Sequence, residues 1–197
     1  MREKKDLIYN CGKEIFESKG FKDTNVAEIM KKAGMATGTF YNYFISKDKL
    51  FMEIYKDENA KLKRRILDSL NMEAEPILVM QEMMRKNLQG MLEHPILREW
   101  YNRDVFQKLE QSFREESGAE QVDFLYDSFV VVIKRWQDEE KMRSDIDAEM
   151  IMAMFGALLN VETHKAEIGL KYFPQVIEYL AEFTMKGLMI NEDQSKA

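Results

Sequence analysis

Three residue types are scarce in this chain of 197 residues, and each scarcity narrows the class of protein. The single cysteine, Cys11, excludes an intramolecular disulfide and is typical of a reducing compartment. The three prolines favour long helices over a turn-rich β fold. Of the two histidines, His164 lies two residues from Glu162, so that on a helix their side chains diverge. We therefore expect no metal site.

Long apolar runs and catalytic motifs are absent as well. No stretch of about 18 apolar residues occurs, so the sequence predicts no transmembrane helix. The charged residues 1–6 lead into an amphipathic segment, a pattern unlike that of a signal peptide, and we expect a cytoplasmic protein. There is no nucleophile elbow, phosphate-binding glycine loop or paired-carboxylate motif. We therefore expect neither an enzyme nor a bound cofactor.

Charge is divided unevenly along the chain. The net charge is −6, which by itself argues against a nucleic-acid partner. Residues 1–65, however, hold 15 Lys and Arg against 10 Asp and Glu, a net charge of +5, whereas residues 66–197 carry a net charge of −11. A basic segment joined to an acidic one is typical of a DNA-binding domain followed by a separate second domain.

Apolar residues recur at helical spacing along the whole chain, and no segment alternates as a strand does. His94 stands before Pro95 at one expected helix start, where a capping or surface role is the simplest expectation. Other helix boundaries are expected at Gly20, Asn25, Gly34, Ser46 and the pair Ser144 and Asp145. We predict an all-α fold of about nine helices. A three-helix helix-turn-helix domain occupies residues 1–46, a helical bundle residues 47–197, and a helix from about 47 to 70 links them.

Two short helices joined at Gly34 have the spacing of a helix-turn-helix motif. In the second, expected from Thr37 to Phe44, Phe40 and Phe44 lie four residues apart and form the buried side. Gly38 lets the backbone approach a duplex closely. Hydroxyl and amide groups that can reach base edges or phosphates come from Thr37, Thr39, Tyr41, Asn42 and Tyr43.

Two further points concern the edges of this motif. Lys47, just after the second helix, is placed to neutralise a phosphate. Tyr41 and Tyr43 have an alternative role as half-buried packing residues, which are common on short helices. The motif therefore predicts a recognition helix with a polar outer side.

The same stretch resembles a known family. The matching residues are Ile15, Phe16, Gly20, Phe21, Thr24, Asn25, Val26 and Ile29, followed by Ala33, Gly34, Met35, Gly38, Thr39, Phe40, Tyr41, Tyr43, Phe44, Lys47 and Leu50. With these spacings, residues 5–55 resemble the DNA-binding domain of TetR-family transcriptional regulators. The resemblance implies DNA contacts by Asn25, Thr37, Thr39, Tyr41, Asn42, Tyr43 and Lys47. It also implies an all-helical ligand-binding and dimerisation domain in the remainder of the chain.

Two positions depart from the family pattern. Asn25 stands where Thr or Ser is frequent, and asparagine caps a helix equally well and can also bond a phosphate. Gly12 stands where a small residue such as alanine is common, and it costs about 1 kcal/mol of helix propensity relative to alanine. Neither departure changes the assignment.

The second domain is rich in methionine and aromatic residues, with 15 methionines in the chain. Ordinary core packing is one explanation, because methionine fills irregular apolar space. The family resemblance favours a pocket for a small apolar or amphipathic effector. The candidate lining residues are Met80, Met84, Leu88, Trp100, Phe106, Phe113, Tyr126 and Phe129.

The family resemblance also places a dimer interface on the last two helices. Gly156 and Gly187 are small residues there that would permit close helix approach, within a dimer or, alternatively, within one chain. The candidate interface residues are Met154, Gly156, Leu158, Val161, Ile177, Leu180, Phe183 and Gly187.

These observations predict a sequence-specific regulator that binds a palindromic operator in double-stranded DNA as a homodimer, most simply as a ligand-responsive repressor. Two alternatives stay open. One is a regulator without small-molecule sensing, whether constitutive, protein-partnered or an activator. The other is a helical small-molecule-binding protein or enzyme whose N-terminal helices only pack.

Overall fold

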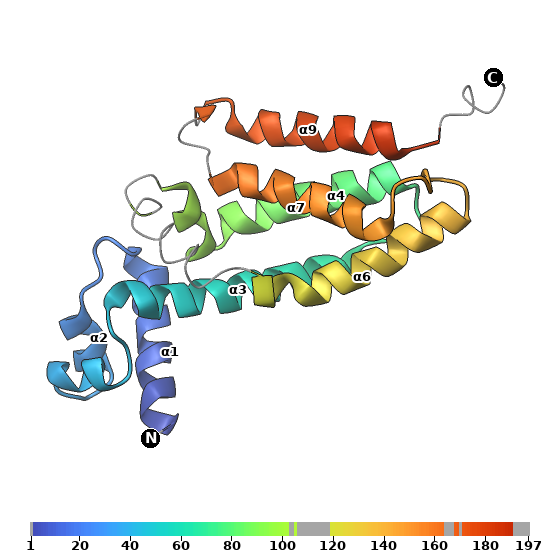
Figure 1. Cartoon of the computed structure of the whole chain (residues 1–197). Helices are drawn as coiled ribbons and strands as arrows, with labels where there is room; N and C mark the ends of the chain where they lie inside the picture. Colours follow the sequence, from blue (N-terminus) through green and yellow to red (C-terminus); the bar gives the residue numbers. More distant parts are fainter. Residues whose placement is uncertain (1, 103–104, 106–118, 164–167, 170, 191–197) are drawn as a thin grey trace. The chain divides into compact units, whose positions relative to one another are not determined.

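The fold is all-α in the part of the chain that the structure describes, as predicted. The computed structural model describes residues 2–102, 105, 119–163, 168–169 and 171–190. Its elements, in the order of Figure 1, are α1 (Arg2–Lys19), α2 (Val26–Lys32), η1 (Thr37–Asn42), α3 (Lys47–Ser69), α4 (Pro76–Glu93), η2 (Leu97–Tyr101), α6 (Ala119–Asp138), α7 (Ala148–Thr163) and α9 (Phe173–Leu188). No helix within these ranges is long and apolar enough to cross a membrane.

Local capping explains where the first helices begin and end. Gly20 follows α1 with a φ of +79°, and Gly34 follows α2 with a φ of +67°, a region that glycine adopts without strain. The side-chain oxygen of Asn25 accepts a first-turn N–H of α2 at 2.9 Å. The hydroxyl of Ser46 accepts a first-turn N–H of α3 at 3.2 Å. These predicted boundaries are confirmed.

The third helix is tighter and shorter than the sequence predicted. A regular α-helix is expected from Thr37 to Phe44, but η1 is a 3₁₀ helix of six residues. Ala36 at its start offers no side-chain cap, and Gly38 has a low helix propensity, so a short α-helix gains little here. The N–H of Phe44 still donates to the carbonyl of Phe40 at 3.0 Å, which keeps these two rings on one side.

The chain forms two compact units, and each combines two stretches of sequence. The first unit comprises Met1–Lys63 with Leu88–Gln121, and the second comprises Arg64–Asn87 with Val122–Ala197. Helices α3 and α4 therefore each belong partly to one unit and partly to the other. The predicted boundary at residue 46 divides a DNA-binding segment from the rest of the chain, and it does not coincide with a boundary between the compact units. It stays a prediction.

The first unit has an aromatic core. The rings of Phe16 and Phe21 each meet the ring of Phe51 edge-on, with centroids 5.0 Å apart. A Cβ atom at Gly12 would lie 2.8 Å from Leu50 Cδ2, so the glycine lets α1 pack closely on α3. This contact gives a packing reason for the helix-weakening residue noted in the sequence.

The second unit has a methionine-rich core. Its buried residues are Val79, Met80, Ile133, Trp136, Met142, Ala148, Ile151, Met185 and Leu188. They come from α4, α6, α7, α9 and the turn after α6. The predicted cap at Ser144 and Asp145 is wrong. Asp147 caps α7 by accepting the N–H of Met150 at 2.6 Å, while Asp145 pairs with Arg143 at 2.5 Å.

Candidate DNA-binding surface

Helix η1 has one buried side and one open side. Phe40 is fully buried and Phe44 nearly so, and their ring centroids lie 5.6 Å apart. On the open side, the exposed residues are Thr37, Gly38, Tyr41 and Asn42. The half-buried residues are Thr39 and Tyr43. Because the two rings are fixed in the core, the backbone of η1 presents its polar groups in a defined direction.

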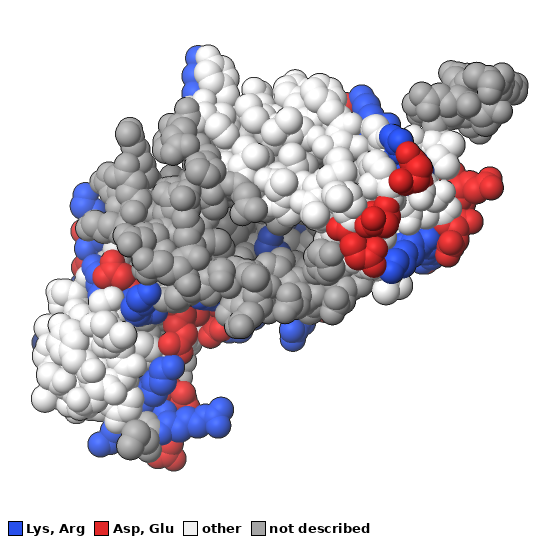
Figure 2. All heavy atoms as spheres, viewed as in Figure 1, with Lys and Arg blue, Asp and Glu red and all other residues white. Residues whose placement is uncertain are grey.

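The open side of η1 carries no formal charge. Residues 33–46, from the end of α2 to the start of α3, contain no Asp, Glu, Lys or Arg. Figure 2 shows this region as an uncharged area at the lower left, with charged side chains at its border. Hydroxyl, amide and backbone groups suit the edges of bases, whereas the bordering cations suit phosphates.

Two exposed side chains give this surface its character. Tyr41 is 61% exposed, and its ring meets Phe40 edge-on at 5.4 Å, so it packs on the core and still presents its hydroxyl outward. Ile45 is 84% exposed at the end of the motif. Sequence reasoning missed Ile45, because the helical pattern gives no sign that an apolar residue between Phe44 and Ser46 points outward.

The turn before α2 places Asn25. Thr24 is buried, and its hydroxyl donates to the carbonyl of Gly20 at 2.7 Å. Asn25 itself is exposed and caps α2, so its amide stands at the positive end of that helix. Such a position suits a phosphate oxygen. The predicted phosphate contact stays a prediction, and the capping role is confirmed.

Lys47 has a role that the sequence did not suggest. Its ammonium donates to the carbonyls of Phe21 and Thr24, at 2.8 and 2.7 Å, and lies 4.3 Å from the centre of the Phe21 ring. The lysine therefore ties the start of α3 to the turn between α1 and α2. Its contact with a phosphate stays a prediction. Any such contact would come from an ammonium group that already binds two carbonyls.

A buried carboxylate, also missed by sequence reasoning, connects α1, α3 and the end of α4. The side chain of Glu58 is 8% exposed and receives Lys13 at 2.7 Å, Lys61 at 2.8 Å and His94 at 3.2 Å. Burial alone would raise the pKa of Glu58, but the two lysine hydrogen bonds outweigh it and lower the pKa to about 2. His94 also accepts the N–H of Ile96 through Nδ1, but Ile96 is itself the cap residue of η2, and η2 has no side-chain cap, so the capping role expected of His94 is not confirmed.

The residues predicted to line an effector pocket divide between the two units. Met80 and Phe129 are buried and Met84 is half-buried in the second unit, whereas Leu88 and Trp100 belong to the first. Phe106, Phe113 and the side chain of Tyr126 lie outside the described residues. Three of the predicted residues therefore lie in one unit, and the pocket itself stays a prediction.

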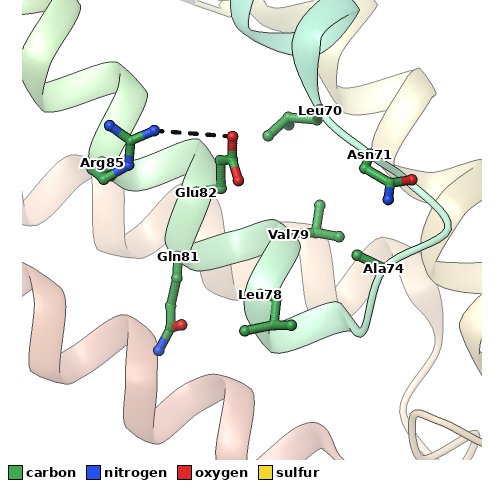
Figure 3. A pocket seen from close by; sticks show the side chains of 8 residues that line it. All are labelled: Leu70, Asn71, Ala74, Leu78, Val79, Gln81, Glu82 and Arg85. Carbon is green, nitrogen blue, oxygen red and sulfur yellow. Dashed lines mark ion pairs between the residues drawn. The ribbon is translucent and has the colours of Figure 1, made fainter.

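A hollow of about 400 Å³ lies at the turn from α3 to α4 in the second unit. Its lining residues, shown in Figure 3, are Leu70, Asn71, Ala74, Leu78, Val79, Gln81, Glu82 and Arg85. Glu82 and Arg85 form an ion pair at 3.9 Å, and Lys86 pairs with the same carboxylate at 2.9 Å. None of the predicted pocket residues lines this hollow, and its charges already have partners.

Helices α7 and α9, which pack together, carry the predicted interface residues. Of these, Met154, Leu180, Phe183 and Gly187 are exposed, and Gly156, Leu158, Val161 and Ile177 are half-buried. The structure adds Met150, Tyr172 and Tyr179, each more than half exposed. Among the described residues, a Cβ atom at Gly156 or Gly187 would meet nothing within 4 Å, so the packing of this part of the chain does not require these glycines.

Comparisons with known proteins bear on this motif directly. Residues 8–54 match the model of the bacterial regulatory proteins of the tetR family, a segment that covers most of α1 and all of α2 and η1. This segment is therefore similar to the corresponding segment of that family. Similar proteins include the HTH-type transcriptional regulator YdgC of Bacillus subtilis, 37% identical over 73 residues, and the HTH-type transcriptional regulator QacR of Staphylococcus aureus, 37% identical over 57 residues.

The sequence matches cover only part of the chain, whereas the structural matches cover most of it. The YdgC match spans 37% of this chain and 36% of that regulator, and the QacR match spans 29% and 30%. The solved structure of RolR with resorcinol covers 98% of this chain and 91% of that chain, with a TM-score of 0.66 at 13% identity. A TetR-family regulator from Mesorhizobium loti covers 96% and 98%, with a TM-score of 0.57 at 20% identity. The whole chain therefore has the TetR fold.

Proposed function

We propose that this chain is a transcriptional regulator of the TetR type that binds a palindromic operator as a homodimer. Each subunit places η1 in the major groove of one half-site, most simply as a repressor that a small amphipathic effector releases. The observation that carries DNA binding is the open side of η1, a set of uncharged hydrogen-bonding groups held by two buried phenylalanines. The match of residues 8–54 to the tetR family model supports the same conclusion.

Selection of bound duplexes from a random DNA pool tests sequence-specific binding. We expect the chain to enrich a palindrome, and the logarithm of the affinity to fall linearly with the logarithm of the salt concentration. Asn42→Ala should weaken binding to the selected duplex by about tenfold, because a bidentate base contact contributes about 1–3 kcal/mol. Asn10→Ala, at an exposed position of α1, is the matched control. Equal affinity for scrambled DNA would refute the proposal.

Homodimerisation is supported by the apolar surface of α7 and α9. Phe183 and Tyr179 are 62% and 56% exposed, and their rings stack with centroids 6.0 Å apart. Exposed aromatic residues that cluster on one surface are typical of protein interfaces. Figure 2 shows a broad uncharged area over α7 and α9. A two-fold axis that pairs these helices would bury the same side chains on both subunits.

An effector site in the second unit is supported by one buried donor without a partner. The indole N–H of Trp136 is buried within the methionine-rich core, and none of the described residues offers it an acceptor within hydrogen-bond distance. An unsatisfied buried donor costs about 1–3 kcal/mol, so a ligand that brings an acceptor and an apolar body would gain binding energy there. RolR, whose structure contains resorcinol, has the same fold.

Thermal shift and DNA release with two probes test the effector proposal. Resorcinol and decanoic acid represent a hydroxylated aromatic and a fatty-acid amphiphile. We expect one probe to raise the melting temperature and to release the selected duplex, and Trp136→Phe to lose both effects while still binding DNA. If release from DNA survives in Trp136→Phe, the indole is not part of the site. If neither probe changes either measurement, regulation without these ligand classes is favoured.

A further inference from the structure

The carboxylate of Glu99 reaches the turn between α1 and α2 from a point 78 residues further along the chain. Its Oε1 accepts the N–H of Phe21 at 3.1 Å, and its Oε2 accepts the side-chain amide of Asn102 at 3.0 Å. Glu99 lies in η2, where the neighbouring Trp100 is buried and stacks on Tyr55 of α3 with centroids 5.5 Å apart. The carboxylate is therefore held in place by its own element.

The same turn is held from its carbonyl side by Lys47. The ammonium of Lys47 binds the carbonyls of Phe21 and Thr24, so that the residue Phe21 donates its N–H to an anion and offers its carbonyl to a cation. Such charge-assisted bonds are stronger than neutral ones. A Cβ atom at Gly20 would lie 2.5 Å from Glu99 Oε1, so the carboxylate approaches this closely only because residue 20 is glycine.

We propose that Glu99 is a positioning residue for DNA binding, which acts by holding the turn that places Asn25 at the start of α2. This inference rests on the proposed DNA-binding function. Between Phe21 and Asn25, Thr24 is buried and donates to the carbonyl of Gly20. Because this bond makes the turn rigid, a displacement of Phe21 also displaces Asn25. The DNA-contacting elements therefore depend on a side chain far outside the helix-turn-helix motif.

Replacement of the Glu99 carboxylate distinguishes a role in positioning the turn from a role in folding. The variant Glu99→Ala removes the acceptor, whereas Glu99→Gln keeps a carbonyl oxygen that can accept the N–H of Phe21. We expect Glu99→Ala to bind the selected duplex about tenfold more weakly, and Glu99→Gln to regain most of that loss. The amide proton of Phe21 in a ¹H–¹⁵N spectrum of the free protein should move upfield in Glu99→Ala and much less in Glu99→Gln.

Glu93→Ala is the matched control. It removes the same charge from an exposed position at the end of α4, where the carboxylate binds only the nearby Gln89 in the described contacts. We expect its affinity and the Phe21 signal to match those of the unmodified chain. If Glu93→Ala weakens DNA binding as much as Glu99→Ala does, net charge explains the effect and the positioning role is refuted.

Further outcomes distinguish this inference from the function on which it rests. An unmodified chain that binds no selected duplex overturns both. Specific binding that persists unchanged in Glu99→Ala, with the Phe21 signal moved, overturns the positioning role alone. Should Glu99→Ala not fold, Asn102→Ala loosens the carboxylate without removing it, and we expect about threefold weaker binding. Unchanged binding in that variant overturns the inference.

Discussion

The open side of η1 carries no charge, whereas α7 and α9 expose large apolar side chains beside charged ones such as Glu149 and Lys186. Around η1 the exposed groups are hydroxyls and amides, as in Tyr41 and Asn42, and the core beneath them is filled by Phe40. On α7 and α9 many of the exposed side chains are large and apolar, as are those of Met150 and Phe183. The surface of η1 is suited to hydrogen bonding, and the surface of α7 and α9 is suited to burial against a partner.

Under the proposed function, this difference indicates how long each partner would stay bound. Water can satisfy the polar groups of η1 when no DNA is present, so that surface can release its partner without penalty. Apolar surface gains about 25 cal/mol for every Å² removed from water, so the surface of α7 and α9 favours a lasting partner. A permanent dimer that binds DNA reversibly fits both surfaces.

The largest expected effect comes from emptying the core beneath η1. Phe40→Ala removes a fully buried ring and should lower the free energy of unfolding by about 3–5 kcal/mol. Chemical denaturation measures this. Tyr41→Ala, its exposed neighbour, should change stability by no more than about 0.5 kcal/mol while losing DNA affinity. Similar stability losses in both variants would show that the open side of η1 is part of the core.

Charging the surface of α7 and α9 tests its role in dimerisation. We expect Phe183→Glu to convert the dimer to a folded monomer at micromolar concentration in analytical ultracentrifugation, because two carboxylates would be buried at each two-fold contact. Val131→Glu is the matched control, an equally exposed apolar position on α6. A dimer that persists in Phe183→Glu but dissociates in Val131→Glu would place the interface on α6.

Acid should weaken the first unit through Glu58. Its pKa is lowered to about 2 in the folded chain, whereas the ordinary value is 4.5, so its contribution is present above pH 4.5 and is lost as the pH falls towards 2. We expect this contribution to be about 3 kcal/mol. Denaturation of Glu58→Gln at several pH values should show a lower stability at pH 7 and a flatter decline between pH 4.5 and 2. An unchanged slope would contradict this assignment.

The smallest changes in stability are expected at Gly34 and Gly156, which both have open space around them among the described residues. Gly34 has a φ of +67°, so Gly34→Ala should cost about 1–2 kcal/mol from backbone strain. Gly156 lies within α7 and has no such strain, so Gly156→Ala should gain about 0.5–1 kcal/mol of helix stability. If Gly156→Ala also weakens the dimer, a partner helix approaches that position closely. Thermal unfolding and sedimentation distinguish the two effects.

Local signals made the first unit largely predictable. The caps at Asn25 and Ser46 and the turn at Gly34 act over three or four residues, and each lies where the sequence indicated. The 3₁₀ geometry of η1 was not predicted, because the α and 3₁₀ forms of so short a helix differ by little energy and the surrounding core decides between them.

Contacts between distant parts of the chain were not predictable in the same way. The sequence marked Lys47 as a phosphate ligand, but tertiary structure ties it to Phe21 and Thr24. Nothing near Glu58 or Glu99 in sequence shows that the one is buried among cations or that the other reaches Phe21. Such contacts depend on which helices meet, and a one-dimensional pattern does not contain that information.

By itself, the sequence determined the helical class, the helix-turn-helix motif and its polar outer residues, because capping and helical periodicity are local properties. Only the tertiary structure decided which side chains hold that motif in place and which apolar residues of α7 and α9 stay uncovered. Burial and long-range hydrogen bonds arise when segments far apart in the chain come together, as Glu99 and Phe21 do.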